Sequence, residues 1–290
     1  MEKDRKIIPL ILGVGPPRSG TTWLYKTFKN VGEICMPINI KEIEYWDRKY
    51  AKGINWYLDN FNVMNSHKYI SDISPNYITS PEKITKALNL FDKVKILINL
   101  RNPYDRIISM YGYYTMAGGK INLKNFIQED HWVESHILMK DNVTAIINSF
   151  KKDNIHFILF DDIKTKPIIM LSELNSFLNI SDSTFMVSKG IKEKVHSTKK
   201  PRLQFINRYV FKLQGFMRHK LQINYLPEKL KYNKLVNKLL FSSKGNKLDG
   251  KNYKNYFDPW IFKVDNDIDF IEDLVNKDLS HWKSDNYFVG

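Results

Sequence analysis

The stretch that decides the fold lies near the start of the chain and reads Gly15-Pro16-Pro17-Arg18-Ser19-Gly20-Thr21-Thr22-Trp23-Leu24. It follows the apolar run from Ile7 to Val14 and opens a segment of helical character. A buried strand, a glycine-containing loop and then a helix form the layout of a phosphate-binding loop on a parallel sheet. The apolar run is too short to span a bilayer, so we expect a buried strand and no membrane span.

One residue sets this loop apart from a nucleoside-triphosphate loop. Where a Walker A loop carries lysine between glycine and serine or threonine, this chain reads Gly20-Thr21-Thr22. The Walker lysine reaches the β and γ phosphates, and the adjacent hydroxyl holds magnesium. The loop therefore predicts an anion other than Mg·ATP, with Arg18 as a fixed positive charge and with hydroxyl donors from Ser19, Thr21 and Thr22.

Composition indicates a packed globular protein with a basic surface. Of the 290 residues, 43% are hydrophobic and 13% aromatic, which predicts a real core. The formal charge of +14 is large enough to attract polyanions. No module signature of a nucleic-acid-binding protein is present, so we expect an anionic cofactor or acidic glycan, or merely solvated lysines, and not nucleic acid.

Cysteine and histidine usage bears on compartment and metal. Cys35 is the single cysteine in the sequence, which excludes an internal disulfide and a thiolate zinc cluster. A reducing compartment, and hence a cytoplasmic location, fits this usage. The seven histidines show no pair at metal-ligand spacing supported by a third ligand, so no metal site is predicted.

Apolar runs alternate with helical segments along the first two thirds of the chain. The runs suit strands covered on both faces, and they lie at residues 7–14, 94–100 and 155–160. The helical segments between and after them lie at residues 21–30, 103–114 and 168–178. This order predicts a P-loop-type three-layer α/β/α fold around a mostly parallel sheet. We expect one domain over residues 1–290, with the basic stretch 188–250 as a helical lid or substrate-facing insertion.

A second segment offers another anion site. Arg101 follows the predicted strand 94–100, at the edge where open α/β sheets bind ligands. Asn102 is placed to cap the next helix with Pro103 at its first position, and Ser109 lies further along that helix. Arg101 and Ser109 together predict a clamp for a second phosphate.

These two segments resemble the 5′-phosphosulfate loop and the 3′-phosphate motif of sulfotransferases that use 3′-phosphoadenylyl sulfate (PAPS). The resemblance implies a PAPS-dependent sulfotransferase that releases 3′-phosphoadenosine 5′-phosphate (PAP) and requires no metal. It assigns Arg101 and Ser109 to the 3′-phosphate, with Arg106 as a weaker addition. By position it assigns the phosphosulfate end to Arg18, Ser19, Gly20, Thr21, Thr22 and Trp23.

A third segment extends the resemblance to the catalytic base. The stretch Lys41-Glu42-Ile43-Glu44-Tyr45-Trp46-Asp47 is similar to the acidic-aromatic stretch of heparan sulfate and related carbohydrate sulfotransferases. In that family the glutamate after the lysine is the general base, which implies Glu42. Transfer to an alcohol needs a base within hydrogen-bond reach of the hydroxyl. Glu44 is the rival carboxylate, and the histidine base of cytosolic small-molecule members leaves His67 and His131 as alternatives.

The sequence departs from the heparan-type pattern at one position. Residues 71–77 match a family stretch in which those members carry a lysine where Ile73 stands. The missing charge would come from Arg18, or from Lys199, Lys200 or Arg202 in the basic insertion. The family also closes a late basic loop over the cofactor. Residues 189–190 and 199–202 are both candidates for this loop, and we favour Lys200 and Arg202.

The acceptor stays open at the level of sequence, as does the oligomeric state. Trp46, Trp56 and Tyr57 would suit a sugar or glycan, and equally a small-molecule alcohol. Two rival functions are a P-loop kinase or ATPase with a degenerate loop, for which Asp161-Asp162 would hold the metal, and a non-catalytic polyanion-binding protein that uses residues 188–250.

Overall fold

The computed structural model describes residues 8–129, 131–180 and 249–289. Lys199, Lys200 and Arg202, and almost all of the predicted basic insertion, lie outside the described residues. The chain divides into two compact units, the first made of Met1–Arg101 and Met139–Val195 and the second of Asn102–Leu138 and His196–Gly290. The expectation of one domain over residues 1–290 stays a prediction.

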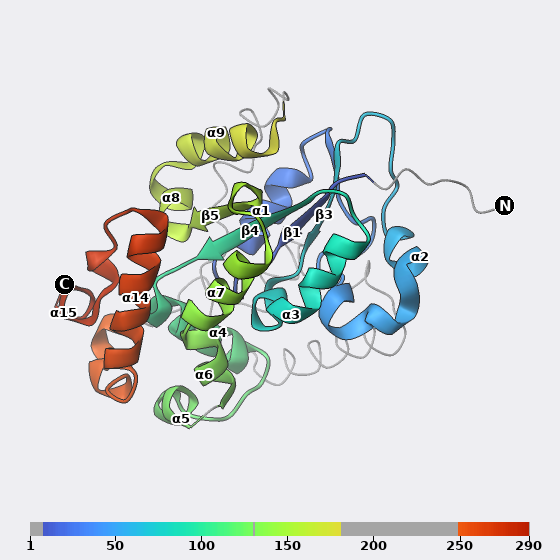
Figure 1. Ribbon diagram of the computed structural model, residues 1–290. Helices are drawn as coiled ribbons and strands as arrows, with labels where there is room; N and C mark the ends of the chain where they lie inside the picture. Colours follow the sequence, from blue (N-terminus) through green and yellow to red (C-terminus); the bar gives the residue numbers. More distant parts are fainter. Residues whose placement is uncertain (1–7, 130, 181–248, 290) are drawn as a thin grey trace, which may run out of the picture. The chain divides into compact units, whose positions relative to one another are not determined.

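The first unit is built on a five-stranded parallel sheet with the strand order β2-β3-β1-β4-β5 (Figure 1). Its strands are β1 Leu10–Gly13, β2 Ile34–Cys35, β3 Tyr69–Ile73, β4 Val94–Leu100 and β5 Ile155–Leu159. All residues of β1, β3 and β4 are buried, as expected of parallel strands covered on both faces. The predicted α/β class is confirmed, and so are the three strands expected from the apolar runs.

The register places the candidate site at one edge of the sheet. Leu10 of β1 pairs with Ile70 of β3 and with Val94 of β4. Because all strands run in the same direction, their carboxyl ends lie at the same edge. The loop after β1, Ser74 after β3 and Arg101 after β4 all begin there.

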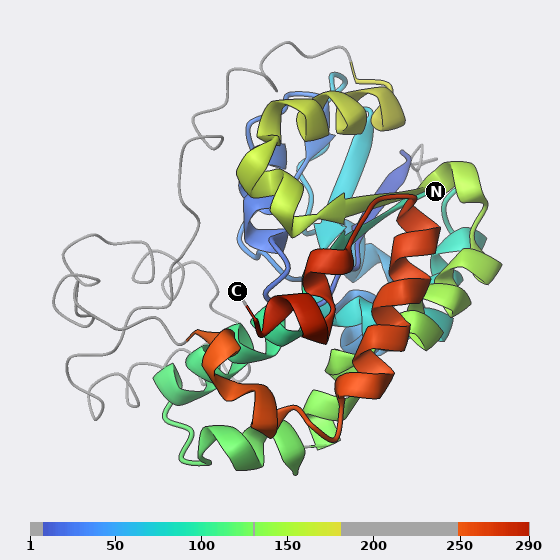
Figure 2. The same ribbon diagram turned by 90° about the vertical axis from the view of Figure 1, so that its left-hand side faces the viewer.

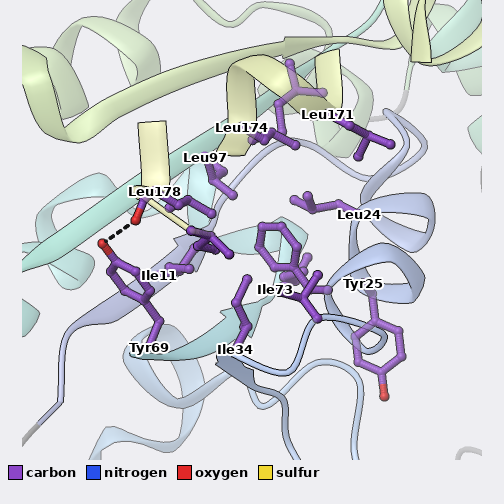
Figure 3. Close-up of a cluster of buried hydrophobic side chains, with 14 of the residues drawn as sticks. Ile11, Leu24, Tyr25, Ile34, Tyr69, Ile73, Leu97, Leu171, Leu174 and Leu178 are labelled. Carbon is purple, nitrogen blue, oxygen red and sulfur yellow. Dashed lines mark hydrogen bonds between the residues drawn. The ribbon is translucent and has the colours of Figure 1, made fainter. Parts of the chain in front are cut away.

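One face of the sheet is covered by α1, Thr21–Phe28, and α9, Pro167–Leu178 (Figure 3). Ile11 and Leu97 project from the strands against Leu24 of α1 and against Leu171 and Leu174 of α9, all fully or almost fully buried. The turned view in Figure 2 shows α9 lying along this face. Both helices match the segments expected at residues 21–30 and 168–178.

Short helical segments complete the first unit. Those before β4 are η1 Tyr45–Lys49, η2 Tyr50–Lys52, α2 Gly53–Leu58, η3 Pro75–Thr79, α3 Pro81–Ile84 and η4 Thr85–Asn89. Those after it are α7 Lys140–Ser149, η5 Lys152–Asn154 and α8 Phe160–Thr165. Within the described ranges, no helix is long and apolar enough to cross a membrane.

The second unit is helical in its described part. Its elements are α4 Pro103–Met116, α5 Leu123–Gln128, α6 His131–Ile137, η7 Gly250–Tyr256, α14 Ile261–Val275, η8 Ser280–Trp282 and α15 Ser284–Tyr287. As predicted, α4 starts with Pro103, and the Asn102 side chain accepts hydrogen bonds from the backbone N–H groups of Tyr104 and Asp105. The Tyr104 hydroxyl donates to Asp265 of α14 at 3.1 Å, which joins α4 to α14.

Candidate active site

The loop between β1 and α1 is held close to strand β4. A Cβ atom added at Gly15 would lie 2.4 Å from the backbone nitrogen of Asn99, so no side chain fits there. Arg18 has a φ of 71° and Gly20 a φ of 94°, both in the left-handed region. The backbone thus turns at Arg18 and again at Gly20, and Gly20 is the N-cap of α1. The loop is therefore a tight backbone cradle at a helix N-terminus, where N–H groups favour an anion.

Arg101 is brought to this loop by strand β4. Its guanidinium donates from Nη1 to the carbonyl oxygen of Arg18 at 3.0 Å. The same guanidinium lies over the ring of Phe160, with 4.5 Å between Cζ and the ring centroid. Because Phe160 begins α8, the ends of β4 and β5 together fix Arg101 beside the loop.

The hydroxyl side chains of the loop are mostly buried. Ser19 is fully buried, and its Oγ atom has no hydrogen-bond partner among the described residues. Thr21 is 4% exposed, whereas the Thr22 hydroxyl accepts a hydrogen bond from Lys41 at 3.1 Å. Trp23 is 3% exposed and belongs to the apolar cluster shared with Ile11. Its side chain therefore contributes to packing beneath α1.

Glu42 reaches the loop through its neighbour Lys41. The Lys41 ammonium donates to Glu42 Oε1 at 2.7 Å and to Thr22 Oγ1 at 3.1 Å. The Lys41 side chain is 11% exposed, and the Glu42 side chain is 38% exposed and so is accessible to a substrate. The rival Glu44 lies within ion-pair distance of Arg48, at 3.4 Å, and of Lys49, at 3.9 Å. Glu42 is thus connected through Lys41 to Thr22 in the first turn of α1, whereas Glu44 lies near Arg48 and Lys49.

A buried polar network fixes the backbone that follows Glu42. Asp72 is fully buried and accepts hydrogen bonds from Ser74 Oγ and from the Tyr77 hydroxyl, both at 2.7 Å. Ser74 Oγ in turn accepts a hydrogen bond from the backbone N–H of Glu44 at 3.1 Å, and the Tyr77 hydroxyl accepts one from the backbone N–H of Tyr45 at 2.8 Å. Burial raises the pKa of Asp72 from 3.8 to about 6, although both hydroxyl donors and the Ile43 backbone oppose that rise.

Two aromatic residues considered for the acceptor belong to the core. Trp46 and Tyr57 are fully buried, with ring centroids 5.4 Å apart, and Phe91 packs against Trp46 at 6.2 Å. They stabilise the segment behind Glu42 and do not line a surface for an acceptor. Trp56 is half-buried, with the Lys52 ammonium 4.6 Å from its ring centroid.

The Ile73 side chain belongs to the core, and His67 lies away from the loop after β1. Ile73 is fully buried in the cluster under α1 and α9, and a Cβ atom on Gly13 would lie 3.0 Å from its side chain. His67 lies just before β3, at the edge of the sheet opposite the loop. This position gives no support to His67 as a base, and the histidine alternatives, His67 and His131, stay predictions.

The remaining candidates belong to the second unit. Ser109 lies on α4, and Arg106 on the same helix is fully buried and donates to the carbonyl oxygen of His136. That contact gives Arg106 a structural role within its own unit. His131 begins α6.

Sequence reasoning missed Lys41 and Asp72 as parts of the site. Lys41 was visible only as the residue before Glu42, and its contact with Thr22 joins positions 19 residues apart. Asp72 stands inside a strand, and a charged residue flanked there by buried neighbours is a signal of a buried network.

The all-parallel sheet and the glycine loop at a helix N-terminus define a P-loop-type α/β protein with a candidate anion site at the carboxyl edge of its sheet. Residues 9–269 match the family model described as Sulfotransferase domain. The chain therefore belongs to the sulfotransferase domain family.

Two relatives agree with this membership. The bifunctional heparan sulfate N-deacetylase/N-sulfotransferase 4 of Mus musculus is 24% identical over 202 residues, which cover 62% of this chain and 23% of that protein. The bifunctional heparan sulfate N-deacetylase/N-sulfotransferase 3 of Homo sapiens is 33% identical over 117 residues, 38% of this chain and 13% of that protein. The chain thus spans less than a quarter of either relative's length.

A sulfotransferase from Alicyclobacillus acidocaldarius shares the fold across nearly the whole chain. Its crystal structure aligns with a TM-score of 0.61 at 16% identity and covers 94% of this chain and 98% of that chain.

Proposed function

We propose that this chain transfers the sulfuryl group of PAPS to an acceptor hydroxyl at the carboxyl edge of its sheet. The observation that supports the proposal is the pair of contacts made by Lys41, which connect the Glu42 carboxylate to Thr22, directly after a loop that has no Walker lysine. A base next to an anionic donor is the arrangement that transfer to a hydroxyl requires. Family membership supports the same reaction class.

The residues of the loop fit the phosphosulfate end of the donor. Gly15 and Gly20 let the loop pack tightly against Asn99 and Ile163, and the N-terminus of α1 supplies N–H groups and a favourable dipole. PAPS would supply an activated sulfuryl group whose bond to the 5′-phosphate breaks during transfer. In the proposal Arg18 and the hydroxyls of Thr21 and Thr22 stabilise the charge that develops on the oxygens.

In the proposed transfer the acceptor oxygen attacks sulfur in line. The new sulfur–oxygen bond forms as the bond to the 5′-phosphate breaks, and PAP leaves with the electron pair. Glu42 takes the proton of the acceptor hydroxyl and so becomes neutral as the leaving group becomes more negative. Proton, charge and leaving group therefore balance within one step.

The 3′-phosphate of the donor is assigned to Arg101 and Ser109. Arg101 supports this role by its position at the end of β4, where its guanidinium already contacts the loop. The matching test is calorimetric titration of Arg101→Ala with PAP and with adenosine 5′-phosphate, which lacks the 3′-phosphate. We expect the variant to lose affinity for PAP far more than for adenosine 5′-phosphate, and equal losses would reject the assignment.

The acceptor is proposed to be a sugar, a glycan or a small-molecule alcohol. The relatives named above are heparan sulfate N-sulfotransferases, and the formal charge of +14 favours an acidic glycan among these choices. A screen with ³⁵S-labelled PAPS would present heparosan, N-desulfated heparin, chondroitin, a phenol and a long-chain alcohol, and mass analysis would locate the sulfuryl group. Glu42→Gln is expected to lower transfer to the best acceptor by about a hundredfold or more.

A thermal-shift comparison separates the proposal from a kinase or ATPase. PAP without metal is expected to stabilise the chain more than ATP with magnesium, and the reverse order would favour the kinase alternative.

We also propose a cytoplasmic location, because Cys35 is a buried free thiol whose pKa is raised by burial. Such a thiol needs no oxidising compartment.

A further inference from the structure

The segment that carries Glu42 has little regular structure of its own. Residues 36–44, between β2 and η1, form neither helix nor strand. A side chain on such a loop is held less precisely than one on a helix or strand. Misplacement of a reacting group by about 1 Å costs about a hundredfold in rate. Glu42 therefore needs an anchor close to its carboxylate.

The described contacts provide an anchor on each side of Glu42. On the far side, the backbone N–H of Glu44 is held by Ser74 Oγ at 3.1 Å, and the Ile43 carbonyl oxygen accepts from Lys49 Nζ at 2.8 Å. On the near side, Lys41 connects Glu42 Oε1 to Thr22 Oγ1. Thr22 lies in the first turn of α1, directly after the anion-binding loop. The Lys41 contact thus joins the carboxylate to the helix that begins the donor site.

The surroundings of Lys41 make this contact stronger than an ordinary surface ion pair. Its side chain is only 11% exposed, so water screens the attraction less than at an open surface. The ammonium has three donors, and two of them are used by a carboxylate oxygen and a hydroxyl oxygen. A single flexible side chain therefore fixes two groups relative to each other.

We propose that Lys41 is a positioning residue of the sulfuryl transfer. By contacting both the Glu42 carboxylate and the Thr22 hydroxyl, it holds the carboxylate at a fixed position relative to the donor loop. This inference rests on the proposed function and adds to it the group that orients the base. As Glu42 takes the acceptor proton and loses its charge, the Lys41 ammonium stays between the carboxyl group and the loop.

The test uses two variants at Lys41 and a matched control elsewhere. Lys41→Met keeps the aliphatic stem but removes the charge and the donors, whereas Lys41→Arg keeps both. Lys68→Met is the control, because Lys68 Nζ also forms a short ion pair, 2.5 Å from Glu33, but lies at the opposite edge of the sheet. Each variant is assayed for PAP affinity by calorimetry, for melting temperature, and for kcat and KM with ³⁵S-labelled PAPS and the best acceptor of the screen.

The expected pattern is a loss in turnover without a matching loss in binding. Lys41→Met is expected to lower kcat by about a hundredfold, while PAP affinity and the acceptor KM stay within about threefold of the parent. Lys41→Arg is expected to recover most of kcat, and Lys68→Met to leave it unchanged. A loss of kcat of less than about threefold in Lys41→Met would overturn the proposal.

A double variant separates positioning of the base from general support of the fold. In a Glu42→Gln background, adding Lys41→Met is expected to lower kcat by no more than about twofold further, because Lys41 acts through the carboxylate. A full additional loss would show that Lys41 acts elsewhere and would overturn the proposal. A parent chain that neither binds PAP nor transfers label would instead reject the proposed function. An active parent with an indifferent Lys41→Met rejects only the role of Lys41.

Discussion

Asp72→Asn is expected to change how the stability of the protein depends on pH. Asp72 is fully buried in β3 and accepts hydrogen bonds from Ser74 and Tyr77, and its burial raises the pKa from 3.8 to about 6. A raised pKa means that the folded protein binds this proton more tightly than the unfolded chain does. The stabilisation by this group is complete below about pH 4 and is lost as pH rises through 6.

The magnitude follows from the size of the pKa shift. The rise is about two pKa units, and each unit corresponds to about 1.4 kcal/mol, so the contribution of Asp72 to the free energy of unfolding falls by about 3 kcal/mol between acid and neutral pH. Asparagine has nearly the same shape but does not titrate. Its single amide oxygen can replace only one of the two acceptors, since Ser74 donates to Oδ1 of Asp72 and Tyr77 to Oδ2, but that loss does not depend on pH in this range.

Urea unfolding at a series of pH values between 4 and 7.5 measures this effect. Because other carboxylates titrate in both proteins, the informative quantity is the difference in free energy of unfolding between the parent and Asp72→Asn. We expect the advantage of the parent to be largest near pH 4 and to shrink by about 2–3 kcal/mol by pH 7. A difference constant to within about 0.5 kcal/mol, or one that grows with pH, would refute a raised pKa for Asp72.

Two further substitutions test the loop and the second unit. Gly15→Ala places a Cβ atom 2.4 Å from the Asn99 backbone nitrogen, so we expect a lower melting temperature and loss of calorimetric PAP binding. Gly53→Ala is its control, because nothing lies within 4 Å of the added Cβ atom. The control is expected to cost only the backbone strain at a φ of 82°, about 1–3 kcal/mol. Equal PAP affinity in the two variants would contradict a role of the Gly15 loop in binding. Asn102→Ala removes the N-cap of α4 and is expected to lower the free energy of unfolding by about 1 kcal/mol in urea titration, and an unchanged value would deny the cap its energetic role.

The parts of the fold that could be predicted are those with a local signal. Strands β1, β4 and β5 lie in continuous apolar runs, and the start of α4 is indicated by the N-cap Asn102 and by Pro103 at the first helical position. Strand β3 was missed because Ser71 and Asp72 interrupt its apolar pattern, although the structure buries both. Strand β2 is only two residues long, which is too short for any periodicity.

The site was predictable where a motif is contiguous and not where the fold brings distant residues together. The anion-binding loop and Arg101 follow from the ends of apolar strands, which is a local pattern. Trp46 and Tyr57 were considered as acceptor contacts, since composition cannot separate an aromatic residue in the core from one at a binding surface. The role proposed for Lys41 depends on a contact with Thr22, which forms only when the chain after β2 folds back onto α1.

The strand order has a consequence for how the protein folds as it is synthesised. β1 is made before the other strands but lies in the middle of the sheet, where Leu10 pairs with Ile70 on one side and Val94 on the other. It therefore leaves the ribosome with no partner strand, and dozens of residues must follow before either neighbour exists. Pairing of such distant segments is slow, and an unpaired apolar strand is exposed to aggregation while it waits. The loop after β1 takes its shape only once β4 has arrived, since Asn99 of that strand lies against Gly15.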